Sequence, residues 1–178
     1  GLGCEKEAET EWNEAPVLGG IALEPNPATV ADDIRCEVFD VSDPESDEVD
    51  VFFSWTVAGV PVDVEEQVLP SGWFAKNEMV VCSAVPEDDR GQGSARSIGL
   101  TVSNATPELL SVSIEPEWPT SQDRLTCQVE GSDPDGDMWV AETIWSVDGK
   151  TVQEEGALID GFSPGDMVRC TATLSDGT

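Results

Sequence analysis

The residues best suited to chemistry lie in one short acidic segment, Asp133-Pro134-Asp135-Gly136-Asp137. Three carboxylates stand at alternate positions, and the glycine permits a tight turn that can gather their oxygens around one hard cation. This arrangement suits Ca2+ better than Mg2+, because Mg2+ demands a stricter octahedral geometry. Two interpretations follow: Asp133, Asp135 and Asp137 form a calcium site, or they form a solvated acidic turn between two strands.

A second acidic segment, Ser42-Asp43-Pro44-Glu45-Ser46-Asp47-Glu48, precedes the first by about ninety residues. It carries Asp43, Glu45 and Asp47 at the same alternate positions but has no glycine in the turn, so we predict it as the weaker metal site. A calcium site of the extracellular class has a Kd of about 0.1 to 1 mM. Its predicted role is to stiffen the protein, because a ligand of the native state adds stability by mass action.

Catalysis and nucleic-acid binding are not expected of this chain. It contains neither histidine nor tyrosine, so it lacks the commonest general base and the phenolic acid. Asp160, Asp166 and the pair Asp88-Asp89 are predicted to be turn residues, since no partner base accompanies them. With 37 acidic and 8 basic residues, the formal net charge of -29 repels nucleic acids and anionic lipid headgroups.

The elements that must hold these acidic loops belong to an internal repeat of the sequence. A cysteine, a tryptophan and a second cysteine recur about ninety positions apart, in similar local sequence. The two sets are Cys36, Trp55, Cys82 and Cys127, Trp145, Cys170. This repeat predicts two modules, residues 15–104 and 105–178, each large enough to support its own core. Residues 1–14 precede them as a tether or a strand-donating segment.

Short stretches of apolar residues, separated by Pro, Gly, Asp and Asn, predict an all-β fold. The strands expected in the first module are 20–23, 34–39, 51–57, 79–85 and 98–102. Those expected in the second are 112–115, 125–129, 141–147 and 167–174, and Asp148-Gly149 predicts a hairpin to one further strand. The repeated aromatic residues are expected in the two cores; they are Trp55, Phe74, Trp145 and Phe162.

The second module has no counterpart of strand 98–102 within the chain. Either the chain is part of a longer tandem array, or another chain supplies the missing strand. The N-terminal segment is a candidate donor, in which Ala8, Thr10 and Trp12 share one face of an extended strand.

The cysteines predict an oxidising location, with the protein secreted or at the cell surface. Four of the five form one pair per module, Cys36 with Cys82 and Cys127 with Cys170, as a disulfide framework requires. No run of about eighteen apolar residues is present, so no transmembrane segment is expected.

Cys4 follows Gly1-Leu2-Gly3, and this segment resembles the end of a bacterial lipoprotein signal peptide, although Gly1 replaces the usual leucine. Two interpretations of Cys4 are open: it is lipidated, or it is an unpaired cysteine that either joins another chain or has no role. Asn104 heads an Asn-x-Thr glycosylation sequence, but Pro107 follows it, and we interpret the segment first as a linker.

Several motifs together resemble the tandem Ig-like or PKD-like repeats of large bacterial surface and secreted proteins. They are Pro-x-x-Pro-Thr, Cys-x-Val, Asp-Pro-Asp-Gly-Asp, Trp-x-Val-Asp-Gly and Gly-Asp-x-Val-x-Cys, and the resemblance covers residues 15–178. It implies two immunoglobulin-like β-sandwich modules, each with a disulfide between its sheets and a tryptophan packed on it. Val80 and Val168 replace the tyrosine of antibody-type domains, which argues against antibody or receptor relatives.

The resemblance implies a structural extracellular repeat protein that forms part of a surface stalk, fibre or filament, without catalysis of its own. Its expected partners are copies of itself or neighbouring Ig-like modules. One alternative is an adhesive module that binds a glycan or a surface protein through the tryptophans outside the repeat, and another is an accessory domain of a secreted enzyme. The tryptophans outside the repeat are Trp12, Trp73, Trp118 and Trp139.

Overall fold

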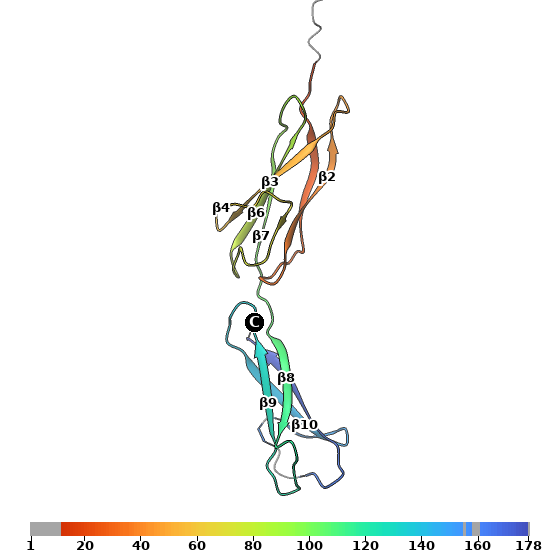
Figure 1. The fold of residues 1–178 in the computed structure, drawn as a ribbon, viewed down its shortest axis with the longest axis vertical. Coiled ribbons are helices and arrows are strands. Elements are labelled where there is room, and N and C mark those ends of the chain that lie inside the picture. The colour runs from red at the N-terminus through yellow and green to blue at the C-terminus, as the bar shows by residue number, and fades with distance from the viewer. Residues whose placement is uncertain (1–11, 155, 158–160, 178) are drawn as a thin grey trace, which may run out of the picture. The chain divides into compact units, whose positions relative to one another are not determined.

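The computed structural model describes residues 12–154, 156, 157 and 161–177, and over these residues it is all-β, as predicted (Figure 1). Twelve strands form four sheets, and every strand pair is antiparallel. No helix in this part of the chain is long and apolar enough to cross a membrane. The chain divides into two compact units, and the main segment of the first ends at Ser103 while that of the second begins at Asn104. The predictions for Cys4, Ala8, Thr10 and Asp160 lie outside the described residues.

The first unit consists of two sheets. One has the order β1 (Val17–Glu24), β2 (Ile34–Ser42), β5 (Val68–Leu69), and the other has the order β4 (Val60–Val62), β3 (Asp50–Val57), β6 (Met79–Glu87), β7 (Arg96–Thr101). Each of the five strands expected in this module is present, and β4 and β5 are additional short strands. The Cys36–Cys82 disulfide joins β2 of one sheet to β6 of the other.

The second unit repeats this plan with fewer strands among its described residues. β8 (Glu108–Glu115) pairs with β9 (Thr126–Ser132), and the other sheet has the order β11 (Lys150–Glu154), β10 (Val140–Val147), β12 (Val168–Ser175) (Figure 1). The Cys127–Cys170 disulfide joins β9 to β12. β11 follows the turn at Asp148 and Gly149, where the sequence predicts a hairpin.

Each core is centred on its tryptophan and disulfide. Trp55 lies beside Cys82 in the register of β3 and β6, and Trp145 lies beside Cys170 in that of β10 and β12. Both indoles are buried, so the N–H of each needs a partner. Trp55 Nε1 donates to the carbonyl of Glu66 at 2.9 Å, and Trp145 Nε1 donates to that of Gly156 at 2.8 Å.

The repeated phenylalanines differ between the two cores. Phe74 is buried, whereas Phe162 is half-buried against the smaller cluster of Leu125, Trp145 and Val147. The sheets that contain β6 and β12 also differ at one edge. β6 pairs with β3 on one side and β7 on the other, whereas β12 pairs with β10 alone among the described strands.

Candidate metal centre

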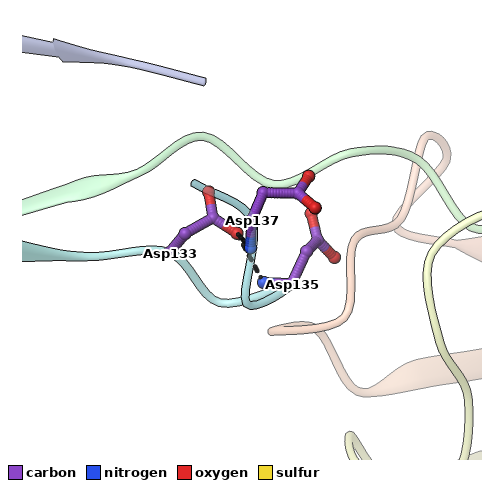
Figure 2. A group of neighbouring side chains, drawn as sticks. All are labelled: Asp133, Asp135 and Asp137. Carbon is purple, nitrogen blue, oxygen red and sulfur yellow. Dashed lines mark hydrogen bonds between the residues drawn. The ribbon is translucent and has the colours of Figure 1, made fainter. Parts of the chain in front are cut away.

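The loop between β9 and β10 gathers the three aspartates of the second unit (Figure 2). Asp133 Oδ1 accepts hydrogen bonds from the backbone nitrogens of Asp135 at 2.8 Å and Asp137 at 3.1 Å, which folds the loop back on the first carboxylate. Gly136 completes the turn with a φ of 78°, in the left-handed region that glycine adopts without strain. One ligand oxygen from each aspartate then lies within 4.8 Å of the others.

Two carboxylate oxygens of this loop are buried without a hydrogen-bond partner. They are Asp133 Oδ2 and Asp135 Oδ1. A buried oxygen of a carboxylate that has lost its water and gained no donor is costly, and neighbouring negative charges add to the cost. Ca2+ lies about 2.3 to 2.6 Å from its ligands, so two oxygens that share one ion are at most about 5 Å apart. The residues of this loop therefore fit a calcium ion in oxygen type, charge and separation.

The segment that enters the second unit is bonded to the same loop. The buried Ala105 N–H donates to Asp135 Oδ2 at 2.6 Å, and Asn104 Nδ2 donates to Asp176 Oδ2 at 2.7 Å. Asn104 Nδ2 also donates to the Ala105 carbonyl at 2.8 Å, so the nitrogen to which a glycan would attach is engaged in the fold. Sequence analysis assigned neither Asn104 nor Asp176 to the site.

The acidic loop of the first unit, between β2 and β3, has the same local fold. Asp43 Oδ1 accepts hydrogen bonds from the backbone nitrogens of Glu45 at 2.9 Å and Asp47 at 3.0 Å. Ser46 occupies the position of Gly136 and adopts a φ of 67°. The missing glycine therefore does not prevent this turn, because a serine takes the left-handed conformation in its place.

The entering segment also bonds to the loop region of the first unit. The backbone nitrogen of Glu14 donates to Glu45 Oε2 at 3.0 Å, and Asn13 Nδ2 donates to Asp88 Oδ2 at 3.3 Å. These bonds match those of Ala105 and Asn104 in the second unit. An asparagine at the entry and an aspartate after the second cysteine are thus repeated along with the acidic loop.

The charges around the first loop differ from those around the second. The carboxylates of Asp43, Glu45 and Asp47 do not place three oxygens within 4.8 Å of one another. Among the described residues, only the acidic loop of the second unit does so. Burial raises the pKa of Asp47, the positive charge of Arg90 opposes that rise, and the acidic neighbours add to it. Three buried oxygens lack a partner here as well; they are Asn13 Oδ1, Asp43 Oδ2 and Asp47 Oδ2.

Asp88 is a structural carboxylate of the first unit. It is buried, with 7% of its surface exposed, and its Oδ1 accepts the backbone N–H groups of Arg90 and Gly91, both at 2.7 Å. The Arg90 N–H lowers the pKa of Asp88 most, burial opposes this, and the Gly91 N–H and the Asn13 amide lower it further. In the second unit, Asp166 Oδ2 accepts the Ser163 N–H at 2.9 Å, so it occupies a turn.

The tryptophans outside the repeat have mixed environments. Trp12 and Trp118 are 88% and 85% exposed, Trp73 is 45% exposed, and Trp139 is half-buried. Glycan stacking requires an exposed ring face, so Trp139 is the least suited of the four.

Fold and loop together define each unit as a two-sheet antiparallel β-sandwich that has one disulfide between its sheets and one acidic loop at its entry. The chain matches no protein-family model, and no curated protein and no solved structure is significantly similar to it.

Proposed function

We propose that this chain is a structural repeat protein outside the cell, part of a surface stalk, fibre or filament, whose second unit binds Ca2+ through Asp133, Asp135 and Asp137. The observation that carries the proposal is the position of the acidic loops. In both units the segment that enters the unit donates one hydrogen bond to the acidic loop and another to the aspartate that follows the second cysteine. An ion at such a place would order the segment through which the chain enters the unit that binds it.

The two carboxylate oxygens of Asp135 explain how ion binding is coupled to the position of the entry segment. Its Oδ2 already holds the Ala105 N–H, while its buried Oδ1 has no protein partner and is available to a cation. Ca2+ would supply positive charge to the three carboxylates and would hold Asp135 in the orientation that engages Ala105. The entry segment is then fixed to its module more firmly with the ion than without it.

The location outside the cell rests on the cysteines. Each unit has one disulfide between its sheets, and such bonds persist in oxidising compartments. The large negative charge of the chain agrees with binding of cations at extracellular concentrations, at which weak sites of this class are occupied.

Isothermal titration calorimetry on the full chain tests the site. We expect saturable Ca2+ binding with a Kd of about 0.1 to 1 mM and weaker binding of Mg2+. Asp133→Asn should abolish the saturable binding of Ca2+. Glu142→Gln removes one charge from an exposed position on β10 and should retain that binding. Absence of Ca2+ heat in the parent, or equal losses in both variants, would contradict the proposal.

Amide hydrogen exchange measured by NMR tests the stiffening role separately. Ca2+ should slow exchange of the Ala105 amide, because its acceptor Asp135 becomes fixed. Small-angle X-ray scattering should show a narrower distribution of distances within the chain when Ca2+ is present. Binding that changes neither measurement would refute the structural role while leaving the metal site intact.

A further inference from the structure

The outer face of the four-stranded sheet in the first unit carries no charge across its centre. On its two middle strands, β3 and β6, the outward residues alternate with buried core residues. These outward residues are Phe52, Ser54, Thr56, Val81, Ser83 and Val85. The neighbouring strand β7 adds Ser97, Gly99 and Thr101. We call these nine positions of β3, β6 and β7 the neutral face.

A neutral surface of this size is unusual for this chain. Charged residues make up 25% of the sequence and lie mostly on protein surfaces, so nine exposed positions would carry about two of them on average. The second unit does have charged residues at two of the matching positions, where Glu142 and Arg169 replace Phe52 and Val81. The neutral face therefore distinguishes the first unit from the second and is not a general consequence of the repeat.

The neutral face is accessible to a partner. Each of its nine residues is half-buried or exposed, and Phe52 at one end is 53% exposed. At the other end, Met79 lies beside Thr101 in the register of β6 and β7 and is 56% exposed. Absence of charge, together with an exposed aromatic ring and a methionine, is typical of the centre of a protein interface.

Two contacts within the neutral face lower the cost of covering it. Ser97 Oγ donates a hydrogen bond to Ser83 Oγ at 3.0 Å, so part of the hydrogen bonding of these hydroxyls does not depend on water. A Cβ at Gly99 would lie 3.0 Å from Val81 Cγ2, so a valine methyl group occupies the space that a side chain at position 99 would take. The middle of the face therefore presents apolar surface and hydroxyls that are already bonded to each other.

The charge of the chain indicates which partner suits this face. Two copies, each with a formal net charge of -29, repel each other wherever their acidic residues meet. The neutral face lets them approach without placing acid against acid, since the acidic residues Asp50 and Glu87 lie opposite each other at one end of it. A basic partner would be attracted to the acidic surfaces instead, and nothing in its charge would direct it to this face.

The size of the neutral face suits a reversible pair. Strand spacing and rise give it dimensions of about 20 Å by 25 Å, or roughly 500 Å² for each copy. Two copies would then bury about 1,000 Å² in total, which is the lower limit of a specific interface and lies within the range of transient complexes. An obligate dimer would need a larger and more apolar surface.

We propose that the neutral face is a docking surface for a second copy of this chain, with the two copies paired sheet to sheet through the same nine positions. Such a contact is isologous, so it closes on itself as a dimer. The inference goes beyond the proposed function, because neither the calcium site nor the location outside the cell enters it. In a stalk or fibre it would join neighbouring chains side by side.

Sedimentation velocity of the full chain, from micromolar to millimolar concentration, tests the proposal. We expect reversible dimers whose formation is favoured by added salt, because salt screens the repulsion between two acidic copies. Ser54→Glu and Ser54→Lys should each weaken dimerisation by about tenfold or more, since either charge would be buried without a partner. The control variants Ser113→Glu and Ser113→Lys, at an exposed position on β8, should dimerise as the parent does.

The lysine variant separates docking from a general effect of charge. It makes the chain less negative, so stronger association of Ser54→Lys would show that net charge alone limits pairing and would overturn the proposal. Monomers at every concentration, or dimers that both Ser54 variants form as readily as the parent, would also overturn it. NMR provides a second readout, because amide shifts of the parent should change with concentration at Val81 and Ser97; changes confined to other residues would refute the face. Chelator is present throughout, so failure here leaves the calcium proposal to its own calorimetric test.

Discussion

Replacing Asp135 with asparagine separates the two roles that this side chain has in the second unit. The carboxylate accepts the hydrogen bond of the buried Ala105 N–H and offers a buried, unpartnered oxygen to a cation. Asp135→Asn keeps an acceptor for Ala105 and removes the negative charge. In chelator we therefore expect the second unit of this variant to be at least as stable as that of the parent, because repulsion among the aspartates is reduced.

Calcium should reverse that order. At about 10 mM Ca2+ and a Kd of about 0.1 to 1 mM, ion binding adds about 1.4 to 2.7 kcal/mol to the stability of the parent's second unit. A unit of this size gains about 4 to 8 °C in Tm for each kcal/mol, so its transition should rise by about 6 to 22 °C. Asp135→Asn should lose most of this rise.

Differential scanning calorimetry of the full chain measures both effects, because the two units can give separate transitions. Glu142→Gln serves as the control for a lost charge and should show the parent's full rise. A parent whose Tm is the same in chelator and in Ca2+ would refute the argument from the orphaned oxygens. An equal rise in Asp135→Asn would refute the role given to its carboxylate.

Three further predictions concern single residues. Arg90→Gln should create or strengthen Ca2+ binding in the first unit, seen as a second equivalent in titration calorimetry, because Arg90 places positive charge near Asp47; an unchanged stoichiometry and affinity would contradict this. The Thr120 backbone N–H, and next its hydroxyl, lower the pKa of Asp123, so its stabilising contribution is complete above the ordinary value of 3.8 and is lost as the pH falls through the folded-state pKa. The free energy of unfolding, measured in urea at a series of pH values, should therefore fall less steeply toward acid pH in Asp123→Asn than in the parent. Equal pH dependence in the two proteins would contradict this. Gly93→Ala should destabilise the first unit by about 1 to 3 kcal/mol in urea, since an added Cβ would lie 1.8 Å from the Pro16 carbonyl oxygen; full parental stability would exclude this close packing.

The strands were predictable because their signals are local. Alternation of apolar residues identifies β6 and β12 directly, and the tryptophan beside each second cysteine marks the strand that pairs with them. The short strands β4 and β5 were not predicted, since two or three residues leave no measurable period. Ser46 was not expected in the left-handed conformation, because residues other than glycine seldom adopt it.

The acidic loops were predictable in part. The alternate carboxylates identify Asp133, Asp135 and Asp137, which the structure brings together. Asn104 and Asp176 lie 72 residues apart in the sequence, and only the folded sandwich makes them neighbours. A signal for them does exist, since Asn13 and Asp88 stand at matching positions of the first copy, but it is visible only when the whole repeat is aligned.

The disulfides limit how far a pulling force can lengthen each unit. Cys36 and Cys82 are 46 positions apart in the sequence, and Cys127 and Cys170 are 43 apart. A chain extends by at most about 3.3 to 3.6 Å per residue, so each bond withholds about 140 to 165 Å of contour length from a stretched molecule. Even a unit whose sheets have been torn apart therefore stays short, and reduction of the disulfides would release that hidden length in one step per unit.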